Sequence, residues 1–255
     1  MTDDGRLEGP PDVLARLAAA GIGTVADVLA KAESVRDLPD RSNHVLRIGG
    51  EVFHVKRSRR RGPSREAAAI ALARKAGVPT AAVAFEGRAK GEGSVVGTFD
   101  LAPARPLDDL LREGTLSVEA RDAAFRGLAE AMASLHQARL HHHDLYLNHV
   151  FVDPTGTRPG VTIIDLERTT SHHGLLGRAI VKDLGAIEAS VPVGVVSCEG
   201  RARFLAHYLR SRHFPVRSLL GPLLRRVVKK AAQIRAHVPR TPVGEAARPR
   251  PPAAG

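Results

Sequence analysis

Two aspartates lie at the ends of a predicted hairpin in the second half of the chain. Asp144 precedes the short apolar run 150–152, and Asp165 ends the β-branched run 161–164, so the carboxylates are 21 residues apart. In phosphoryl transfer, one aspartate addresses the acceptor hydroxyl and another holds the metal ion on the nucleotide. The pattern therefore predicts a kinase-type site with Asp144 as catalytic residue. Asp165 is the expected Mg²⁺ ligand, since Mg²⁺ sites commonly use carboxylates together with phosphate oxygens.

A lysine and a glutamate in the first half of the chain complete this set. Lys56 ends a predicted strand, and Glu66 lies near the start of the next predicted helix. A lysine that faces nucleotide phosphates needs a carboxylate to hold its long side chain. We therefore predict that Lys56 and Glu66 bind ATP. The alternative is a surface lysine within the basic run 56–61 and a solvated glutamate, because a separation of 10 residues is short for a protein kinase.

Supporting roles are predicted for two further residues. His149, next to Asn148, stands where a second metal ligand is expected. Mg²⁺ prefers oxygen to nitrogen, so a structural histidine that packs on the loop fits equally well. Asp183 opens a predicted helix and is expected to brace the backbone of the catalytic loop. The alternative for Asp183 is a partner for the helix dipole.

Other chemistries find little support in the sequence. Three adjacent histidines, residues 141–143, rarely converge on one ion, and no HExxH pattern is present. A single cysteine, Cys198, rules out an intrachain disulfide and a four-cysteine zinc site. The GxxxxGK[ST] phosphate loop is absent. No complete GxGxxG precedes Lys56, so the predicted turn 41–44 would have to cover the phosphates with its backbone N–H groups alone.

The distribution of predicted elements indicates two lobes with a ligand cleft between them. In the first part we predict helices at 11–20, 25–32 and 65–75, a polar turn at 37–43, and hairpins built from 45–48 with 51–56 and from 81–85 with 94–99. In the second part we predict helices at 107–112, 118–137, 179–189, 201–212 and 219–237. The expected class is α+β. Its predicted parts are a helical extension (1–40), a strand-rich N-lobe (41–101), a larger helical C-lobe (102–238) and a disordered tail (239–255).

Composition limits the partners and the location. The net charge of +11 suggests an anionic partner such as a nucleotide, a nucleic acid or an acidic lipid. A GC-rich genome that favours Arg and Ala explains the same charge equally well, so the charge alone does not decide between them. Aromatic residues make up only 4% of the chain, which argues against nucleic acid, whose bases stack on aromatic rings. The N-terminus has no apolar segment typical of a secretory signal, and no apolar run is long enough to span a membrane. We therefore expect a cytoplasmic protein.

The last predicted helix, 219–237, carries leucines and valines alternating with arginines and lysines. One interpretation is a basic amphipathic helix that lies on an anionic membrane surface, which would place the protein peripherally on the inner face of the inner membrane. The other interpretation is a terminal helix whose apolar face packs on the core and whose basic face is solvated. The sequence leaves both open.

In their order and spacing, these motifs resemble the lipopolysaccharide core kinase family (Kdo/WaaP type), which has a protein-kinase-like fold. The resemblance covers roughly residues 35–237 and is carried by VFHVKR at 52–57, LH at 135–136, HHDLYLNH at 142–149, IIDLER at 163–168 and VKDL at 181–184. It implies that Lys56 contacts ATP phosphates, that Asp144 is catalytic and that Asp165 binds Mg²⁺. Two positions depart from the family pattern: His143 replaces an arginine, and Glu167 follows Leu166.

Three functions remain open on the sequence. The first is an ATP-dependent phosphotransferase acting on a hydroxyl of a lipopolysaccharide core sugar, as the resemblance implies. The second is a protein or small-molecule kinase of the same fold, because acceptor choice depends on the surface of the helical lobe. The third is a pseudokinase scaffold, which the missing glycine loop and His143 favour and which the retained Lys56, Asp144 and Asp165 argue against.

Overall fold

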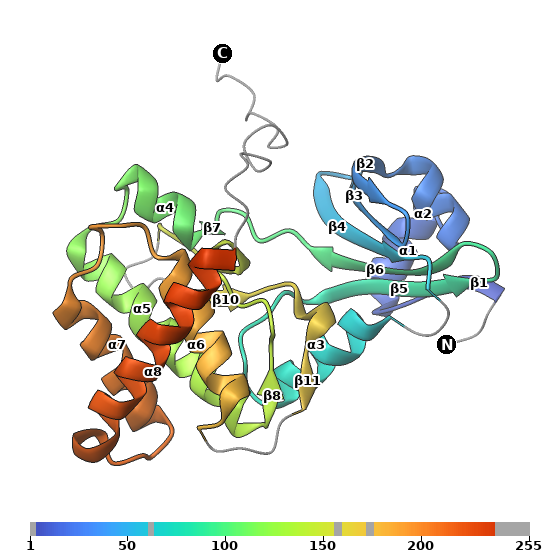
Figure 1. Cartoon of the computed structure of the whole chain (residues 1–255). Coiled ribbons are helices and arrows are strands. Elements are labelled where there is room, and N and C mark those ends of the chain that lie inside the picture. The colour runs from blue at the N-terminus through green and yellow to red at the C-terminus, as the bar shows by residue number, and fades with distance from the viewer. Residues whose placement is uncertain (1–3, 61–63, 156–159, 172–175, 238–255) are drawn as a thin grey trace.

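The structure is a computed structural model that describes residues 4–60, 64–155, 160–171 and 176–237. It has two lobes, with a sheet-rich lobe on one side and a helical lobe on the other (Figure 1). The predicted α+β, two-lobed class is confirmed. The predicted disordered tail, 239–255, lies outside the described residues.

The N-lobe is built on one antiparallel sheet of six strands. In spatial order these are β1 (Asp4–Glu8), β5 (Val83–Ala89), β6 (Gly93–Phe99), β4 (Glu51–Ser58), β3 (Arg41–Ile48) and β2 (Glu33–Leu38). Helices α1 (Pro11–Ala19) and α2 (Val25–Lys31) pack against it through a buried apolar cluster that includes Leu17, Val28, Phe53 and Phe85. The rings of Phe53 and Phe85 meet edge to face, 5.8 Å apart between centroids.

The prediction that residues 1–40 form a helical extension needs correction. Both predicted helices are present, and Thr24 caps α2 in a capping box in which the Asp27 carboxylate accepts a hydrogen bond from the backbone amide of Thr24. However, β1 pairs with β5 and β2 pairs with β3, so this segment supplies two strands of the N-lobe sheet. Short, charged strands of this kind carry too few apolar residues for their pattern to reveal them.

The predicted polar turn at 37–43 is also shorter than expected. Strands β2 and β3 are joined by a tight connection at residues 39–40, and residues 41–44 belong to β3 rather than to a turn. Alternate residues Ser42, His44 and Leu46 point inward and are buried, as a half-buried strand requires. The prediction that the backbone N–H groups of residues 41–44 cover the phosphates is therefore wrong, because these residues pair with β2 and β4 in the sheet.

Helix α3 (Arg65–Lys75) connects the sheet with the C-lobe and has the predicted bounds. The Ser64 side chain accepts a hydrogen bond from a backbone amide of its first turn, and the chain leaves the helix at Gly77, whose φ is +73°. The helix packs against β5 and against a short 3₁₀ helix of the C-lobe, η2 (Leu166–Arg168). It therefore brings its first turn close to the cleft.

The C-lobe is helical with small strands on the cleft side. Its helices are α4 (Leu107–Glu113), α5 (Val118–Gln137), α6 (Arg178–Ser190), α7 (Cys198–Ser211) and α8 (Val216–His237). Its short elements are β7 (Arg105–Pro106), β8 (Leu140–His141), η1 (Leu147–His149), β9 (Val150–Val152), β10 (Val161–Ile163) and β11 (Thr170–Ser171). The predicted hairpin is β9 with β10, and β9 also pairs with β7. The core of this lobe lies between α5, α6, α7 and α8.

Helix α8 uses its apolar face inside the protein. Leu223, Val227 and Ala231 are buried against α6 and α7, which supports the core-facing interpretation of this helix. The approach to α6 is close: a Cβ added at Gly185 would lie 2.7 Å from Cγ of Lys230. Among the described residues, no helix combines the length and the apolar character needed to cross a membrane.

Candidate active site

The cleft between the lobes contains an ion-paired triad. Nζ of Lys56, on β4, lies 2.8 Å from Oε1 of Glu66 on α3 and 2.8 Å from Oδ1 of Asp165. The predicted Lys56–Glu66 contact is thus present in the structure. The triad joins three segments that are distant in the sequence, and it places one cation between two carboxylates.

Burial and charge determine the protonation of this triad. Burial alone would lower the pKa of Lys56, but the carboxylates of Glu66 and Asp165 outweigh it and raise that pKa. Burial raises the pKa of Glu66, and the lysine only partly offsets this. Burial also acts to raise the pKa of Asp165, but Lys56 and His149 lower it below its ordinary value. Lys56 therefore stays charged and Asp165 stays ionised at neutral pH.

Asp165 has an unusual backbone conformation. Its φ of 62° and ψ of 56° lie in the left-handed region, which is uncommon for a residue with a side chain. The residue follows β10 and precedes η2, so the chain turns sharply and directs the carboxylate at Lys56. Such strain persists only where the surrounding structure holds it, and it is frequent at functional sites.

His149 links the two aspartates. Its Nδ1 donates to the backbone carbonyl of Asp144 at 2.7 Å, and its Nε2 lies 3.6 Å from Oδ2 of Asp165. A carbonyl can only accept, so Nδ1 carries a proton, and Nε2 faces the carboxylate of Asp165. A histidine that donates its other N–H to a backbone carbonyl is the usual arrangement of a metal-binding imidazole.

The donor set at this position fits a divalent ion that completes its shell with phosphate oxygens. Asp165 offers a carboxylate and His149 an imidazole nitrogen within 3.6 Å of each other. In the described part of the chain, no group of three or more His, Cys, Asp and Glu side chains forms a ready-made metal cage. Mg²⁺ is usually held by one or two carboxylates plus substrate phosphates, so a full protein cage is not required.

Asp144 is paired with an arginine that the sequence analysis did not single out. Nη1 of Arg168 donates to Oδ2 of Asp144 at 2.6 Å. Arg168 lies in η2, three residues after Asp165, and its side chain is 60% exposed, against 29% for Asp144. The only sequence signal was the arginine in the IIDLER motif.

Asp183 holds the loop that leads to Asp144. Its carboxylate accepts hydrogen bonds from the backbone amides of His142 at 2.9 Å and His143 at 3.0 Å, and it also contacts the rings of His136 and His141. The predicted bracing role is confirmed, although Asp183 lies in the interior of α6 rather than at its start. Burial would raise the pKa of Asp183, but the two histidines outweigh it and hold that pKa well below its usual range.

His142 connects the loop to the strand that carries Asp165. The ring is buried, and burial lowers its pKa, so the ring is neutral. Its Nε2 donates to the backbone carbonyl of Ile164 at 2.9 Å. The residue before Asp165 and the residues before Asp144 are therefore fixed to each other.

A cavity of about 460 Å³ extends from the triad between the lobes. Lys56, Glu66 and Asp165 line it, and so do Arg47, His54 and Asp100. The remaining walls are largely apolar and come from both lobes, with Val45, Val55, Val96, Phe99, Leu101, Phe151 and Ile164 among them. A largely apolar slot with a few charged groups is typical of a small-molecule site and has room for a nucleotide base.

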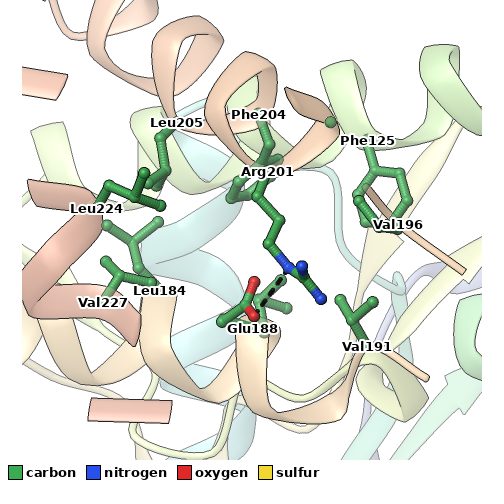
Figure 2. A pocket seen from close by; sticks show the side chains of 12 residues that line it. Phe125, Leu184, Glu188, Val191, Val196, Arg201, Phe204, Leu205, Leu224 and Val227 are labelled. Carbon is green, nitrogen blue, oxygen red and sulfur yellow. Dashed lines mark ion pairs between the residues drawn. The ribbon is translucent and has the colours of Figure 1, made fainter. Parts of the chain in front are cut away.

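A second cavity lies inside the C-lobe (Figure 2). Its volume is about 30 Å³, which suits a single water molecule. The lining is mostly apolar, apart from Glu188 and Arg201, whose charged groups are 3.0 Å apart. This cavity is too small for a nucleotide or a sugar, so the interlobe cleft is the candidate site.

Comparisons with known proteins agree with this geometry. Residues 30–208 match the family described as lipopolysaccharide kinase (Kdo/WaaP). A solved structure described as "WaaP in complex with acyl carrier protein" is similar with a TM-score of 0.74 and 24% identity, covering 90% of this chain and 99% of that one, and it supports the kinase-like fold. No match was found among curated protein sequences. Because the family match spans more than half of the sequence, the chain belongs to the lipopolysaccharide kinase family, whose members are ATP-dependent kinases.

Proposed function

We propose that the interlobe cleft binds ATP with Mg²⁺ and transfers the γ-phosphoryl group to a hydroxyl of a lipopolysaccharide core sugar. The observation that carries the proposal is the Lys56–Glu66–Asp165 triad in the lining of the cavity. In the reaction, the acceptor oxygen bonds to the γ-phosphorus while the bond to the β,γ-bridging oxygen breaks, so ADP leaves. The hydroxyl proton is taken up by a nearby base.

Lys56 and Glu66 form the phosphate-binding half of the proposed site. The apolar walls of the cavity accommodate the base, which leaves the phosphates beside Lys56. Glu66 holds the lysine from the protein side, and its Oε2 is buried without a hydrogen-bond partner among the described residues. A fixed lysine stabilises the charge that develops on the leaving phosphate and needs no reorganisation during transfer.

Asp165 and His149 are proposed to hold the divalent ion, as their donor set allows. A bound Mg²⁺ would supply charge neutralisation of the phosphate oxygens. Asp165 contributes an ionised carboxylate, kept in that form by Lys56 and His149. Nε2 of His149 contributes a nitrogen whose orientation is fixed through the backbone carbonyl of Asp144.

Asp144 is the proposed catalytic residue. It precedes η1 on a loop that Asp183 braces through two backbone amides, so its position is rigid. A carboxylate held at the acceptor position can orient the hydroxyl and accept its proton late in a loose transition state. This role requires that the oxygen now bonded to Arg168 become available to the acceptor.

We also propose that the protein works at the inner face of the inner membrane. With the apolar face of α8 buried, only its basic face can contribute, and Arg225, Arg226 and Lys229 are exposed there. Such a surface is attracted to anionic lipids without inserting into them. Sedimentation with vesicles containing about 30% anionic lipid should retain the protein at low salt and release it at high salt. Salt-independent binding would contradict this electrostatic mode.

A transfer assay tests the proposed function. Radiolabelled ATP is supplied with purified core lipopolysaccharide, with a generic protein or with small sugars, and Asp165→Ala serves as the inactive control. We expect label on the core saccharide with wild-type protein and none with the variant. Label on protein or on free sugars alone would instead support the second candidate, a protein or small-molecule kinase. Nucleotide binding with no transfer to any acceptor would support the pseudokinase alternative.

A further inference from the structure

A third cavity adjoins the nucleotide cleft, and cationic side chains outnumber the carboxylates in its lining. It has a volume of about 620 Å³ and shares Asn43, Lys56 and Glu66 with the nucleotide cavity, so the two are contiguous. The cationic side chains that line it are Arg41, Lys56, Arg57, Arg60, Arg65 and Arg168. We call this cavity the arginine pocket. The lining carries more positive charges than a triphosphate beside Lys56 requires.

Not all of these arginines are available to a ligand. Three of them already have carboxylate partners, in the pairs Arg41–Glu167, Arg57–Glu92 and Arg60–Asp40. Arg65, the first residue of α3, is exposed and has no carboxylate partner among the residues that the structure describes. Arg65 is therefore a cation directed at solvent beside the cleft, and an anion entering the pocket would meet it without breaking an existing pair.

Arg168 is the second cation that an anion in the pocket could reach, and its present position conflicts with the reaction. Its guanidinium is bonded to Oδ2 of Asp144 at 2.6 Å, where an acceptor hydroxyl has to approach. The side chain of Arg168 is 60% exposed, so solvent screens its pair with Asp144 and lowers the cost of separating the two groups. Arg168 also lines the arginine pocket, so a small movement would take it from Asp144 into that pocket.

We propose that the arginine pocket binds an anionic group, a phosphate or a carboxylate, carried by the acceptor, and that Arg168 passes from Asp144 to this group when the acceptor enters. The assignment of the anion to the acceptor rests on the proposed function. Arg65 and Arg168 then hold the anion from two sides, as arginines commonly do with phosphate and carboxylate oxygens. The same movement frees Asp144 for the acceptor hydroxyl, so acceptor binding and catalytic readiness are coupled.

Calorimetry with inorganic phosphate tests the pocket directly. The full chain is first saturated with Mg²⁺ and a non-hydrolysable ATP analogue, so that the nucleotide site is filled, and is then titrated with phosphate. We expect saturable binding of one phosphate, weakened about tenfold in Arg65→Ala and in Arg168→Ala, since each variant removes one charge-assisted contact. Arg217→Ala, which removes an exposed arginine in the first turn of α8, is the matched control and should bind as wild type.

A second titration, with acetate, distinguishes the two kinds of anion. Tighter binding of phosphate identifies a phosphate group on the acceptor, and tighter binding of acetate identifies a carboxylate. The proposal is overturned if Arg65→Ala binds both anions as wild type does. It is also overturned if the ATP analogue prevents phosphate binding, because the pocket would then belong to the nucleotide.

Kinetics with the acceptor separate this inference from the proposed function. With core lipopolysaccharide, Arg65→Ala should raise the acceptor KM about tenfold and leave the KM for ATP unchanged. If no acceptor is phosphorylated at all, the proposed function fails while the phosphate titration still reports on the pocket.

Circular dichroism of each variant checks that its fold is retained. Thr170 also lines the pocket. Mass spectrometry that finds Thr170 fully phosphorylated in the active protein would assign the arginines to this modification and overturn the proposal.

Discussion

Nζ of Lys56 lies 2.8 Å from Oδ1 of Asp165, across 109 residues of the chain. The contact joins the sheet of the N-lobe to the residue that follows β10 in the C-lobe, and Glu66 holds the same ammonium group from α3. One ammonium group therefore bridges the two lobes.

Removing the ammonium group should abolish transfer without unfolding the protein. In Lys56→Met the phosphates lose their fixed cation, and we expect the rate of ADP formation to fall about 100- to 1,000-fold. Lys75→Met, which removes an exposed lysine from the end of α3, is the matched control and should retain wild-type activity. Activity of Lys56→Met within a few-fold of wild type would show that this lysine is not the phosphate ligand.

Removing a proposed metal ligand should weaken ion binding measured directly. With the ATP analogue bound, electron paramagnetic resonance of added Mn²⁺ reports the free ion, and Asp165→Asn should lower the affinity at least about tenfold. His149→Ala should lower it less, because a carboxylate contributes charge as well as a donor. Asp122→Asn, an exposed position on α5, should bind as wild type. Equal affinities for wild type and Asp165→Asn would show that this residue is not a metal ligand.

Chelation of divalent ions with EDTA should abolish transfer.

The brace beneath the catalytic loop should make a large contribution to stability. Asp183 is fully buried and bonded to two backbone amides and two histidines. In Asp183→Ala these partners are left unpaired inside the protein, and we expect the free energy of unfolding to fall by about 3–5 kcal/mol. Urea denaturation measures this loss. A loss below about 1 kcal/mol would mean that water replaces the carboxylate.

The same carboxylate should make the free energy of unfolding depend on pH in the acidic range. The pKa of Asp183 is lowered in the folded state, where its histidine partners outweigh the effect of burial, and is near 3.9 in the unfolded chain. The stabilisation is therefore complete above about pH 4. It is lost as the pH falls from there toward the folded pKa, because only the unfolded chain takes up the proton. Denaturation at a series of pH values from 6 to 3 should show a steeper loss for wild type than for Asp183→Asn, and parallel curves would contradict this assignment.

Close packing in the core of the N-lobe should make one glycine intolerant of any side chain. A Cβ at Gly97, on β6, would lie 2.3 Å from Cζ of Phe85. Gly97→Ala should therefore displace the ring and lower the free energy of unfolding by about 1–3 kcal/mol. Gly23→Ala is the control, since its Cβ would meet no atom within 4 Å and its φ is not positive. Chemical denaturation of both variants compares the two sites, and equal stabilities would show that Phe85 moves freely.

Elements whose signals are local can be predicted from the sequence alone. Helices α3 and α5 were predicted with the bounds that the structure shows, because serine caps and apolar spacing lie within the helices themselves. The β9–β10 hairpin and the order of the motifs around Asp144 and Asp165 were likewise predictable, and with them the family. These features depend on neighbours a few residues apart, which a sequence displays directly.

Tertiary structure decided what depends on distant partners. Strands β1 and β2 could be identified only from their pairing with β5 and β3, because each is a short run of mostly polar residues. The bond from Arg168 to Asp144, the approach of His149 to Asp165 and the excess of arginines beside the cleft arise where separate segments fold together. No spacing rule fixes the rotation of a charged side chain, because its position is set by the charges and backbone groups that the fold brings around it.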